Sequence, residues 1–290
     1  MPKERFHIFL ADRLAREGEL RPPILRDIPA FFVGAVSPDI FYYDLPTFAL
    51  SPLGDWFHSF IDRNGIGAIG DWVRQKAMEE EIGRGRATGE AISWGLGVAC
   101  HFMADELWHP LIEELSGAGL GLVYPGAKNL TPIERHRLIE SEIEAYWFGR
   151  FPEAQKKDYL PPDFRGSRGR LLQIFSHYPS LLQFAGGDGQ GRSAPWAGLS
   201  ERRIARCFLC QNHLLRLFAN KALGVARDRL LSFSPTRSLG ALVAPARPFL
   251  PELFARSMPD NRNPFSDFFM EEALGSLSSN WRLLLERIEA

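Results

Sequence analysis

The chain has 290 residues, 45% of them hydrophobic and 24% charged, which is an ordinary composition for a soluble globular protein with a sizeable core. Its formal net charge of −1 excludes long-range attraction of nucleic acid or anionic membranes by the surface as a whole. The first residues lack the apolar core of a signal peptide, and no run approaches the roughly 20 apolar residues that span a bilayer. We therefore expect a cytoplasmic protein without a transmembrane segment.

Apolar residues recur with the helical period along nearly the whole chain, and no segment alternates as a half-buried strand would. This pattern predicts an all-α fold, most simply one domain over residues 1–290. Residues 1–150 carry the metal-capable side chains described below, and residues 151–290 form a C-terminal helical part. The predicted helices cover residues 3–16, 24–35, 52–62, 66–83, 88–115, 131–149, 167–185, 198–233, 247–257 and 265–288, with loops at 161–170 and 186–196.

The best-marked helix start is the sequence Thr131-Pro132-Ile-Glu134. Thr131 is a good N-cap, Pro132 suits the first helical position, and Glu134 completes a capping box. The residues that follow, including His136 and Glu140, are therefore placed inside a helix.

Metal-capable side chains recur at intervals of four in two predicted helices. An α-helix turns about 100° per residue, so side chains four residues apart share one face. His101, Asp105 and His109 therefore share a face, and His136 with Glu140 repeats the arrangement on another helix. Charged residues at this spacing often form surface ion pairs, which is the alternative interpretation. Large apolar residues flank the first motif, however, and a buried aspartate needs a cation or strong donors, which favours a metal site.

Three more residues fit the same interpretation, although each is weak alone. His7 lies on the apolar face of the first helix, where a histidine is usually a hydrogen-bonded core residue. Asp39 follows Pro38, as a turn aspartate often does. His58 lies among aromatic residues, where a buried hydrogen-bonded histidine is the plainer interpretation. Jointly they count for more, because five of the seven histidines fall in apolar helical stretches of the first half.

Two other features concern packing. Gly95 and Gly97 precede the first motif and permit another helix to approach closely. Cys207 and Cys210, followed by His213, superficially suggest a zinc knuckle, but they lie on one predicted helix without an evident fourth ligand. We expect buried helical thiols in a reducing compartment, without a disulfide framework.

In this order, the motifs resemble those of bacterial zinc-dependent phospholipase C, a family that shares its fold with single-strand-specific fungal nucleases. The resemblance covers roughly residues 5–150 and rests on the following set: His7, Gly34-x-x-Ser-Pro-Asp39, His58, His101-x-x-x-Asp105-x-x-x-His109 and His136-x-x-x-Glu140. It implies an all-α fold with a cleft between helices that holds two or three zinc ions.

The resemblance also implies how the residues share these ions. One ion is surrounded by Asp39, His58, His101 and Asp105, and a second is held by His109, His136 and Glu140. Asp105 bridges to a third ion, which His7 helps to bind. The chain departs from the family in two ways: the spacing from Asp105 to His109 is tighter, and no tryptophan precedes position 56 to supply the N-terminal ligand of the third ion.

Side chains near these motifs carry further expectations. Phe41, Tyr42 and Tyr43 are candidates for the mouth of the cleft, whereas Trp56 and Phe57 are expected to be core. The acids near the predicted ligands (Asp55, Glu106, Glu134 and Glu142) are expected to be solvated rather than bonded to the histidines.

These observations predict a zinc-dependent phosphoric-ester hydrolase, phospholipase C-like, in which metal-activated water attacks a phosphodiester in line. Asp39 is either a ligand or the group that orients and deprotonates the water. A small phosphodiester or phospholipid is the expected substrate, and no stable nucleic-acid complex is expected. Two alternatives stay open: a phosphodiesterase for nucleotides or single-stranded nucleic acid, and a non-catalytic helical scaffold that holds metal for stability.

Overall fold

The computed structural model describes most of the chain, in the following ranges: residues 4–16, 25–45, 47, 49–81, 88–117, 129–151, 168–185, 199–218, 224–227, 230, 245, 248, 250–251 and 259–289. The chain divides into two compact units, each built from three separate stretches. Unit 1 comprises residues 1–6, 104–157 and 213–277, and unit 2 comprises residues 7–103, 158–212 and 278–290. Each unit thus combines residues from the first 150 with residues from the C-terminal part.

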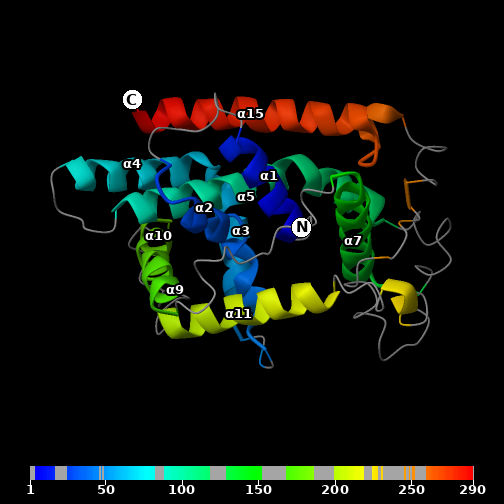
Figure 1. Cartoon of the computed structure of the whole chain (residues 1–290), viewed down its shortest axis with the longest axis horizontal. Helices are drawn as coiled ribbons and strands as arrows, with labels where there is room; N and C mark the ends of the chain where they lie inside the picture. The colour runs from blue at the N-terminus through cyan, green and yellow to red at the C-terminus, as the bar shows by residue number, and fades with distance from the viewer. Residues whose placement is uncertain are drawn as a thin grey trace. The chain divides into compact units, whose positions relative to one another are not determined.

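The described residues form helices and no strand, which confirms the all-α prediction (Figure 1). The elements in chain order are α1 (Glu4–Arg16), α2 (Ile28–Gly34), the 3₁₀ helix η1 (Ser37–Tyr43), α3 (Ser51–Asn64), α4 (Gly67–Glu81), α5 (Thr88–Leu115), α7 (Pro132–Arg150), α9 (Arg168–Phe175), α10 (His177–Ala185), α11 (Glu201–Phe218), the 3₁₀ helix η5 (Asp260–Arg262) and α15 (Asp267–Glu289). Within these parts of the chain, every helix is either too short or too polar to cross a bilayer.

Two predicted helices differ from the structure for local reasons. The helix predicted for residues 24–35 begins only at Ile28, because Asp27 caps it by accepting a hydrogen bond from the Ala30 amide at 3.0 Å. The helix predicted for 167–185 is two helices, α9 and α10. Pro179 has no amide hydrogen to donate to Phe175 and its ring crowds that carbonyl, so a new helix begins at His177.

The prediction for 198–233 holds for α11, which ends at Phe218, while most of 247–257 lies outside the described residues.

The predicted capping box is present at the start of α7. The Thr131 hydroxyl accepts from the Glu134 amide at 3.3 Å, and the Glu134 carboxylate accepts from the Thr131 amide at 2.8 Å. This cap fixes the start of α7, so that His136 and Glu140 lie in its second and third turns, facing the same side.

In unit 2, α2 and α5 cross with their backbones in contact. A Cβ atom added to Gly97 would lie 2.0 Å from the Phe31 carbonyl oxygen, and one added to Gly34 would lie 2.1 Å from the Trp94 carbonyl oxygen. Only glycine fits at either position, which confirms the close approach predicted from Gly97. The other predicted glycine, Gly95, gives room to the Trp72 and Val73 side chains.

The C-terminal end of α15 lies along α4 in the same unit (Figure 1). Arg287 donates two hydrogen bonds to the Asp71 carboxylate, at 2.8 and 2.6 Å. Buried Trp281 packs edge-on against Phe31 of α2. The last residues of the chain thus pack against α2, which leads into η1, and pair with α4.

In unit 1, α7 is fastened to the C-terminal part of the chain. The buried Glu142 carboxylate accepts from the Arg227 guanidinium and, at 3.2 Å, from the Leu250 amide. One helical turn later, Trp147 donates to the Pro264 carbonyl at 2.9 Å. These bonds hold the helix that carries His136 and Glu140. Glu142 was expected to be solvated, and this expectation is wrong because Arg227, far along the chain, supplies its counter-charge.

Candidate metal centre

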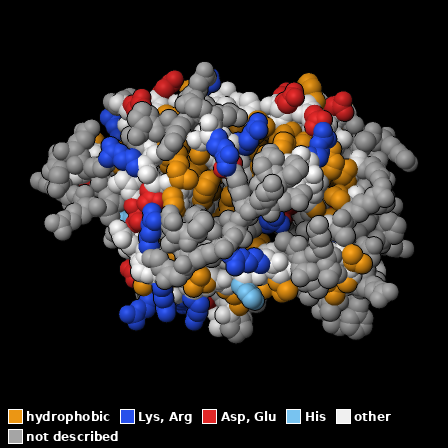
Figure 2. All heavy atoms as spheres, viewed as in Figure 1, with side chains coloured by type: hydrophobic (Ala, Val, Ile, Leu, Met, Phe, Trp, Pro, Cys, Tyr) orange, Lys and Arg blue, Asp and Glu red, His pale blue; other side chains and the backbone are white. Residues whose placement is uncertain are grey.

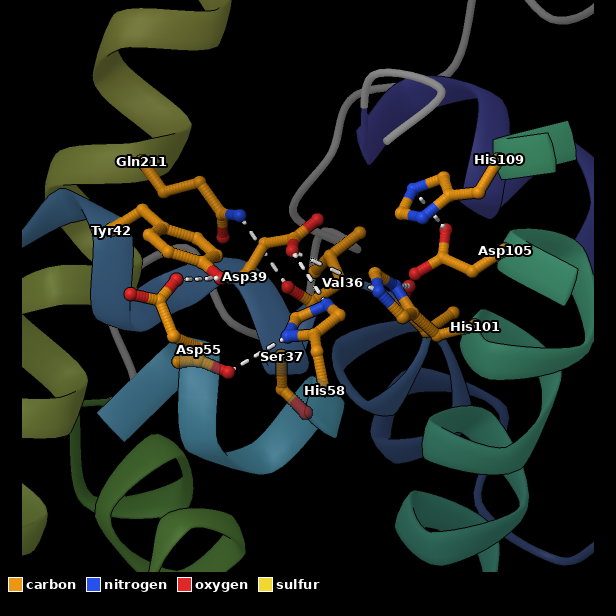
Figure 3. Close-up of polar contacts among 12 residues, drawn as sticks. Val36, Ser37, Asp39, Tyr42, Asp55, His58, His101, Asp105, His109 and Gln211 are labelled. Carbon is orange, nitrogen blue, oxygen red and sulfur yellow. Dashed lines mark hydrogen bonds and ion pairs between the residues drawn. The ribbon is translucent and has the colours of Figure 1, made fainter. Parts of the chain in front are cut away.

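Unit 2 brings together three of the predicted site residues from three elements. Asp39 lies on η1, His58 on α3 and His101 on α5, and ligand atoms from the three residues lie within 4.8 Å of one another. The Asp39 Oδ1 atom is 3.4 Å from His58 Nε2 and 3.8 Å from His101 Nε2. Figure 3 shows the Asp39 carboxylate pointing toward both imidazoles. We call this group the Asp39 centre.

The Asp39 carboxylate lacks ordinary partners. Asp39 is completely buried, and neither of its oxygens accepts a hydrogen bond from any residue in the described ranges. An ionised carboxylate in such a place costs several kcal/mol unless a cation or donors compensate it. Asp39 lies in the first turn of η1, directly after Pro38, and its complete burial favours the metal-site interpretation over that of a solvated turn residue.

The two imidazoles have their tautomers fixed by backbone carbonyls. The Nδ1 atom of His58 lies 2.9 Å from the Gly54 carbonyl oxygen, and the Nδ1 atom of His101 lies 3.0 Å from the Ala35 carbonyl oxygen. A carbonyl only accepts, so each Nδ1 carries the hydrogen, and in the neutral ring each Nε2 presents a lone pair. In that form the two lone pairs face the Asp39 carboxylate, an arrangement that a cation between them would stabilise.

The close crossing of α2 and α5 explains how the His101 imidazole comes within hydrogen-bond distance of the Ala35 carbonyl. Gly97 lies one turn before His101 on α5, and Ala35 directly follows Gly34 on the chain. Backbone contact at Gly34 and Gly97 brings the Ala35 carbonyl within hydrogen-bond distance of the imidazole. The glycines that allow the packing thus also orient a predicted ligand.

Unit 1 holds a second group, made by His109 of α5 with His136 and Glu140 of α7. Ligand atoms of these three residues also lie within 4.8 Å of one another. The His136 Nε2 atom is 2.9 Å from Glu140 Oε1, and the His109 and His136 rings meet edge-on at 5.6 Å. The tighter spacing of Asp105 and His109 keeps them on one face, with His109 Nε2 at 3.4 Å from Asp105 Oδ1 (Figure 3). We call this group the His136 centre.

The electrostatics of the His136 centre favour neutral imidazole. Burial lowers the pKa of His136 to about 2, and the nearby His109 acts in the same direction. Neutral imidazole is the form that binds a metal ion, so the ring need not lose a proton to do so at neutral pH.

Of the two remaining predicted residues, His7 lies beside His101 in unit 2. The His7 ring of α1 stacks on the His101 ring at 3.9 Å, and both rings are completely buried. Asp105 follows His101 by one turn of the continuous helix α5 and is 6% exposed. Two stacked, completely buried imidazoles are unusual for a packed core, because histidine is less often fully buried than apolar residues are.

Several neighbours differ from expectation. Phe41 is completely buried and packs edge-on against Tyr178, so it is core rather than part of a mouth, while Phe57 is core as expected. Tyr42 does lie beside His58, with 6.0 Å between ring centroids, and its hydroxyl donates to exposed Asp55 at 2.9 Å (Figure 3). The residues that orient the histidines are backbone carbonyls, which no side-chain pattern could have revealed.

Arg170 and the two cysteines of α11 also have structural roles. Within the loop predicted for 161–170, the described part from Arg168 onward is helical, and Arg170 donates to Asp27 at 2.8 Å. Cys207 is buried and its Sγ lies 3.8 Å from an oxygen of the Asp44 carboxylate, while Cys210 is half-buried on the same helix. The expectation of helical thiols in place of a zinc knuckle agrees with this geometry.

Comparison with known proteins bears on the same residues. A model of a family described as zinc-dependent phospholipase C matches residues 6–177, more than half of the chain and all eight predicted site residues. The chain belongs to the zinc-dependent phospholipase C family. Searches of curated proteins and of solved structures give no match.

The donor sets suit the zinc that the zinc-dependent phospholipase C family uses. Each centre offers two imidazoles and one carboxylate, which is a common set of protein ligands for a catalytic zinc ion with one open position. The completely buried Asp39 carboxylate, which accepts no hydrogen bond from the described residues, is the observation of this structure that favours a bound cation. The residues present therefore fit the family's metal.

Proposed function

We propose that the chain is a zinc-dependent phosphoric-ester hydrolase of the phospholipase C type, with its reaction at the Asp39 centre. The buried carboxylate that faces two imidazole lone pairs carries this proposal. Zinc, when bound, lowers the pKa of a coordinated water toward about 7 and stabilises negative charge on phosphoryl oxygens.

The proposed ligands of one zinc are His58 Nε2, His101 Nε2 and the Asp39 carboxylate. The carbonyls of Gly54 and Ala35 hold the rings in place, since each accepts from the Nδ1 hydrogen. Asp39 either completes the coordination or accepts a proton from the attacking water. In the second role, its carboxylate must lie within hydrogen-bond reach of that water, which its place between the imidazoles allows.

A second zinc is proposed at the His136 centre, held by His109, His136 and Glu140. Asp105 lies one turn before His109 on α5, with its Oδ1 atom 3.4 Å from His109 Nε2, so a further carboxylate adjoins this centre. The family resemblance also implies a third ion, bound with the help of His7.

The surroundings of the Asp39 centre favour a small phosphodiester or a phospholipid. Asp55 is exposed and bonded to Tyr42 next to His58, so a negative charge lies beside the centre. A polyanion such as single-stranded nucleic acid would be repelled by this carboxylate more strongly than one phosphodiester group with an uncharged or cationic substituent, because it carries more negative charge.

The test uses zinc-loaded protein with three substrates: short-chain phosphatidylcholine, an aryl phosphodiester and single-stranded DNA. We expect hydrolysis of the first two and little or none of the DNA. Cleavage of DNA alone would support the nucleic-acid phosphodiesterase instead. Zinc binding without hydrolysis of any of the three would support the scaffold and contradict the proposal.

A further inference from the structure

The 3₁₀ helix η1, which carries Asp39, is held at its beginning by two helices from later in the chain. The Tyr178 hydroxyl of α10 donates to the Ser37 carbonyl. The Gln211 side-chain amide of α11 donates to the Val36 carbonyl at 3.4 Å, and Figure 3 shows that side chain near Asp39. All of these residues belong to unit 2.

The end of η1 is held by a buried ion pair with α11. Asp44, which directly follows η1, is completely buried. Its carboxylate accepts from Arg203 at 2.6 Å, from Arg206 at 3.1 Å and from the Thr47 hydroxyl at 2.8 Å. Hydrogen bonding from Arg203 holds the pKa of Asp44 well below its usual range, so the carboxylate is ionised at neutral pH.

The two arginines contribute unequally. The Arg206 side chain is 64% exposed, and basic side chains gather over the first turns of α11 at the lower left of Figure 2. The Arg203 side chain is half-buried and donates to Asp44 through both Nε and Nη2. A two-point bond from a planar guanidinium fixes direction as well as distance, so Arg203 is the main anchor.

A 3₁₀ helix needs such support. Its hydrogen bonds have poorer geometry than those of an α-helix, and runs longer than three or four residues are uncommon. The seven residues of η1 therefore depend on contacts from outside for their conformation. A metal ligand must be held within about 0.5 Å of its productive place, so movement of η1 would separate Asp39 from His58 and His101.

We propose that α11 is a positioning element of the metal centre, in which Arg203 acts through Asp44 to hold η1 and thereby aim Asp39 at the ion. The inference rests on the proposed zinc-dependent function, since it assumes an ion at the Asp39 centre. It assigns a role to residues beyond 6–177, the range that the family model matches.

The test compares Arg203→Met with Arg287→Met. Arg287 forms a similar pair with Asp71 in the same unit, at 2.6 Å, but makes no bond to η1. We expect Arg203→Met to weaken zinc binding by up to about 10-fold, the low end of the loss seen for groups bonded directly to a ligand, and Arg287→Met to change it less than about 2-fold. Zinc affinity is measured by competition with a chromophoric chelator, and the visible spectrum of the cobalt-substituted protein reports ligand geometry.

A second pair of variants separates positioning from general stability. Arg203→Lys keeps one charged donor, so we expect it to recover part of the zinc affinity and a spectrum close to the wild type. If Arg203→Met does not fold, Asp44→Asn takes its place, because asparagine has nearly the same shape. The melting temperature of the metal-free variants is recorded beside each titration.

Two outcomes overturn the proposal. One is an unchanged zinc affinity and cobalt spectrum in Arg203→Met. The other is a loss of affinity that follows only from unfolding of the metal-free protein, with a normal spectrum for the bound fraction. Wild-type protein that binds zinc but hydrolyses nothing would refute the hydrolase and leave this test readable, whereas wild-type protein that binds no zinc refutes both.

Discussion

The Asp39 centre and the His136 centre offer the same types of ligand but differ in how they are built. The Asp39 centre draws one residue from each of three elements, and its side chains are 0%, 16% and 0% exposed for Asp39, His58 and His101. The His136 centre uses two helices, and its two histidine side chains are 27% and 24% exposed. One centre is closed by long-range packing, and the other is mostly a property of helical spacing.

The difference predicts how each centre behaves without an ion. At the His136 centre, both histidine side chains are partly exposed, so water can reach them when no ion is bound. At the Asp39 centre, both Nδ1 hydrogens are already bonded to carbonyls, so neutral rings offer the carboxylate no donor. We infer that the Asp39 centre depends more on its ion and binds it more tightly.

The largest effect is expected from Asp39→Asn, which keeps the shape and removes the negative charge. Loss of a ligand or of a proton acceptor predicts a fall in kcat of at least about 10²-fold. The measurement is steady-state hydrolysis of an aryl phosphodiester, with Asp71→Asn as an exposed control.

Zinc content decides between the two roles of Asp39. If Asp39→Asn keeps its zinc and loses only rate, the carboxylate acts as the proton acceptor. If the variant also loses zinc, it acts as a ligand. Unchanged rate would contradict both roles.

The next effect concerns the order in which ions leave. Titration with a chelator should remove about one ion readily and a second with more difficulty, because the more exposed His136 centre exchanges faster with water. Glu140→Gln should abolish the easily removed fraction and leave the tightly held ion in place. Elemental analysis after each step measures this, and loss of the tight fraction in Glu140→Gln would reverse the proposed ranking.

A packing change should affect only one centre. Gly97→Ala places a methyl group against the Phe31 carbonyl, which forces α2 and α5 apart at a cost of about 1–3 kcal/mol. The shift carries the Ala35 carbonyl away from His101, so we expect weaker zinc binding at the Asp39 centre alone. Gly149→Ala on α7, where a Cβ would meet nothing, is the matched control. Equal weakening at both centres would show that the effect is general instability.

A smaller effect is expected from pH. The pKa of Asp44 is lowered by Arg203 in the folded protein, from an ordinary value of 3.8. The pair therefore stabilises the fold above about pH 3.8, and this stabilisation is lost as pH falls below that value. The free energy of unfolding of Asp44→Asn should thus lie below that of the wild type at pH 7, and the difference should shrink toward pH 3. Denaturant titration of metal-free protein measures it, and a difference that grows in acid would refute the assignment.

The smallest effect concerns a thiol beside the Asp39 centre. Burial raises the pKa of Cys100, which precedes His101, to about 12, so the thiol should not react with alkylating reagents at pH 8. Removing zinc should loosen this region and increase the alkylation of Cys100, as measured by mass spectrometry. Glu140→Gln should leave the reactivity of Cys100 unchanged, because that variant empties only the other centre.

Features that depend on local helical spacing could be predicted from the sequence, as at the His136 centre. The spacing of His101, Asp105 and His109, and that of His136 and Glu140, fixed shared helix faces because helical geometry is local. The capping box at Thr131 was predictable for the same reason.

Features that depend on distant contacts were missed. The conformation of η1 was not predicted, since it depends on Tyr178, Gln211 and Arg203, more than 140 residues away from their partners in the chain. Ala35 orients His101 through a carbonyl oxygen, and a carbonyl leaves no mark on the sequence. The resemblance to a known family placed Asp39 in the site, whereas spacing alone did not.

The most direct test of the Asp39 centre is the zinc content of His101→Asn beside that of the wild type, both purified without chelators. Asparagine can still donate to the Ala35 carbonyl, as Nδ1 of the histidine does, but it has no atom in place of Nε2. We predict about two bound zinc ions per wild-type chain and about one fewer in the variant, with a lower melting temperature only when zinc is present. Equal zinc content in the two proteins would contradict the centre described here.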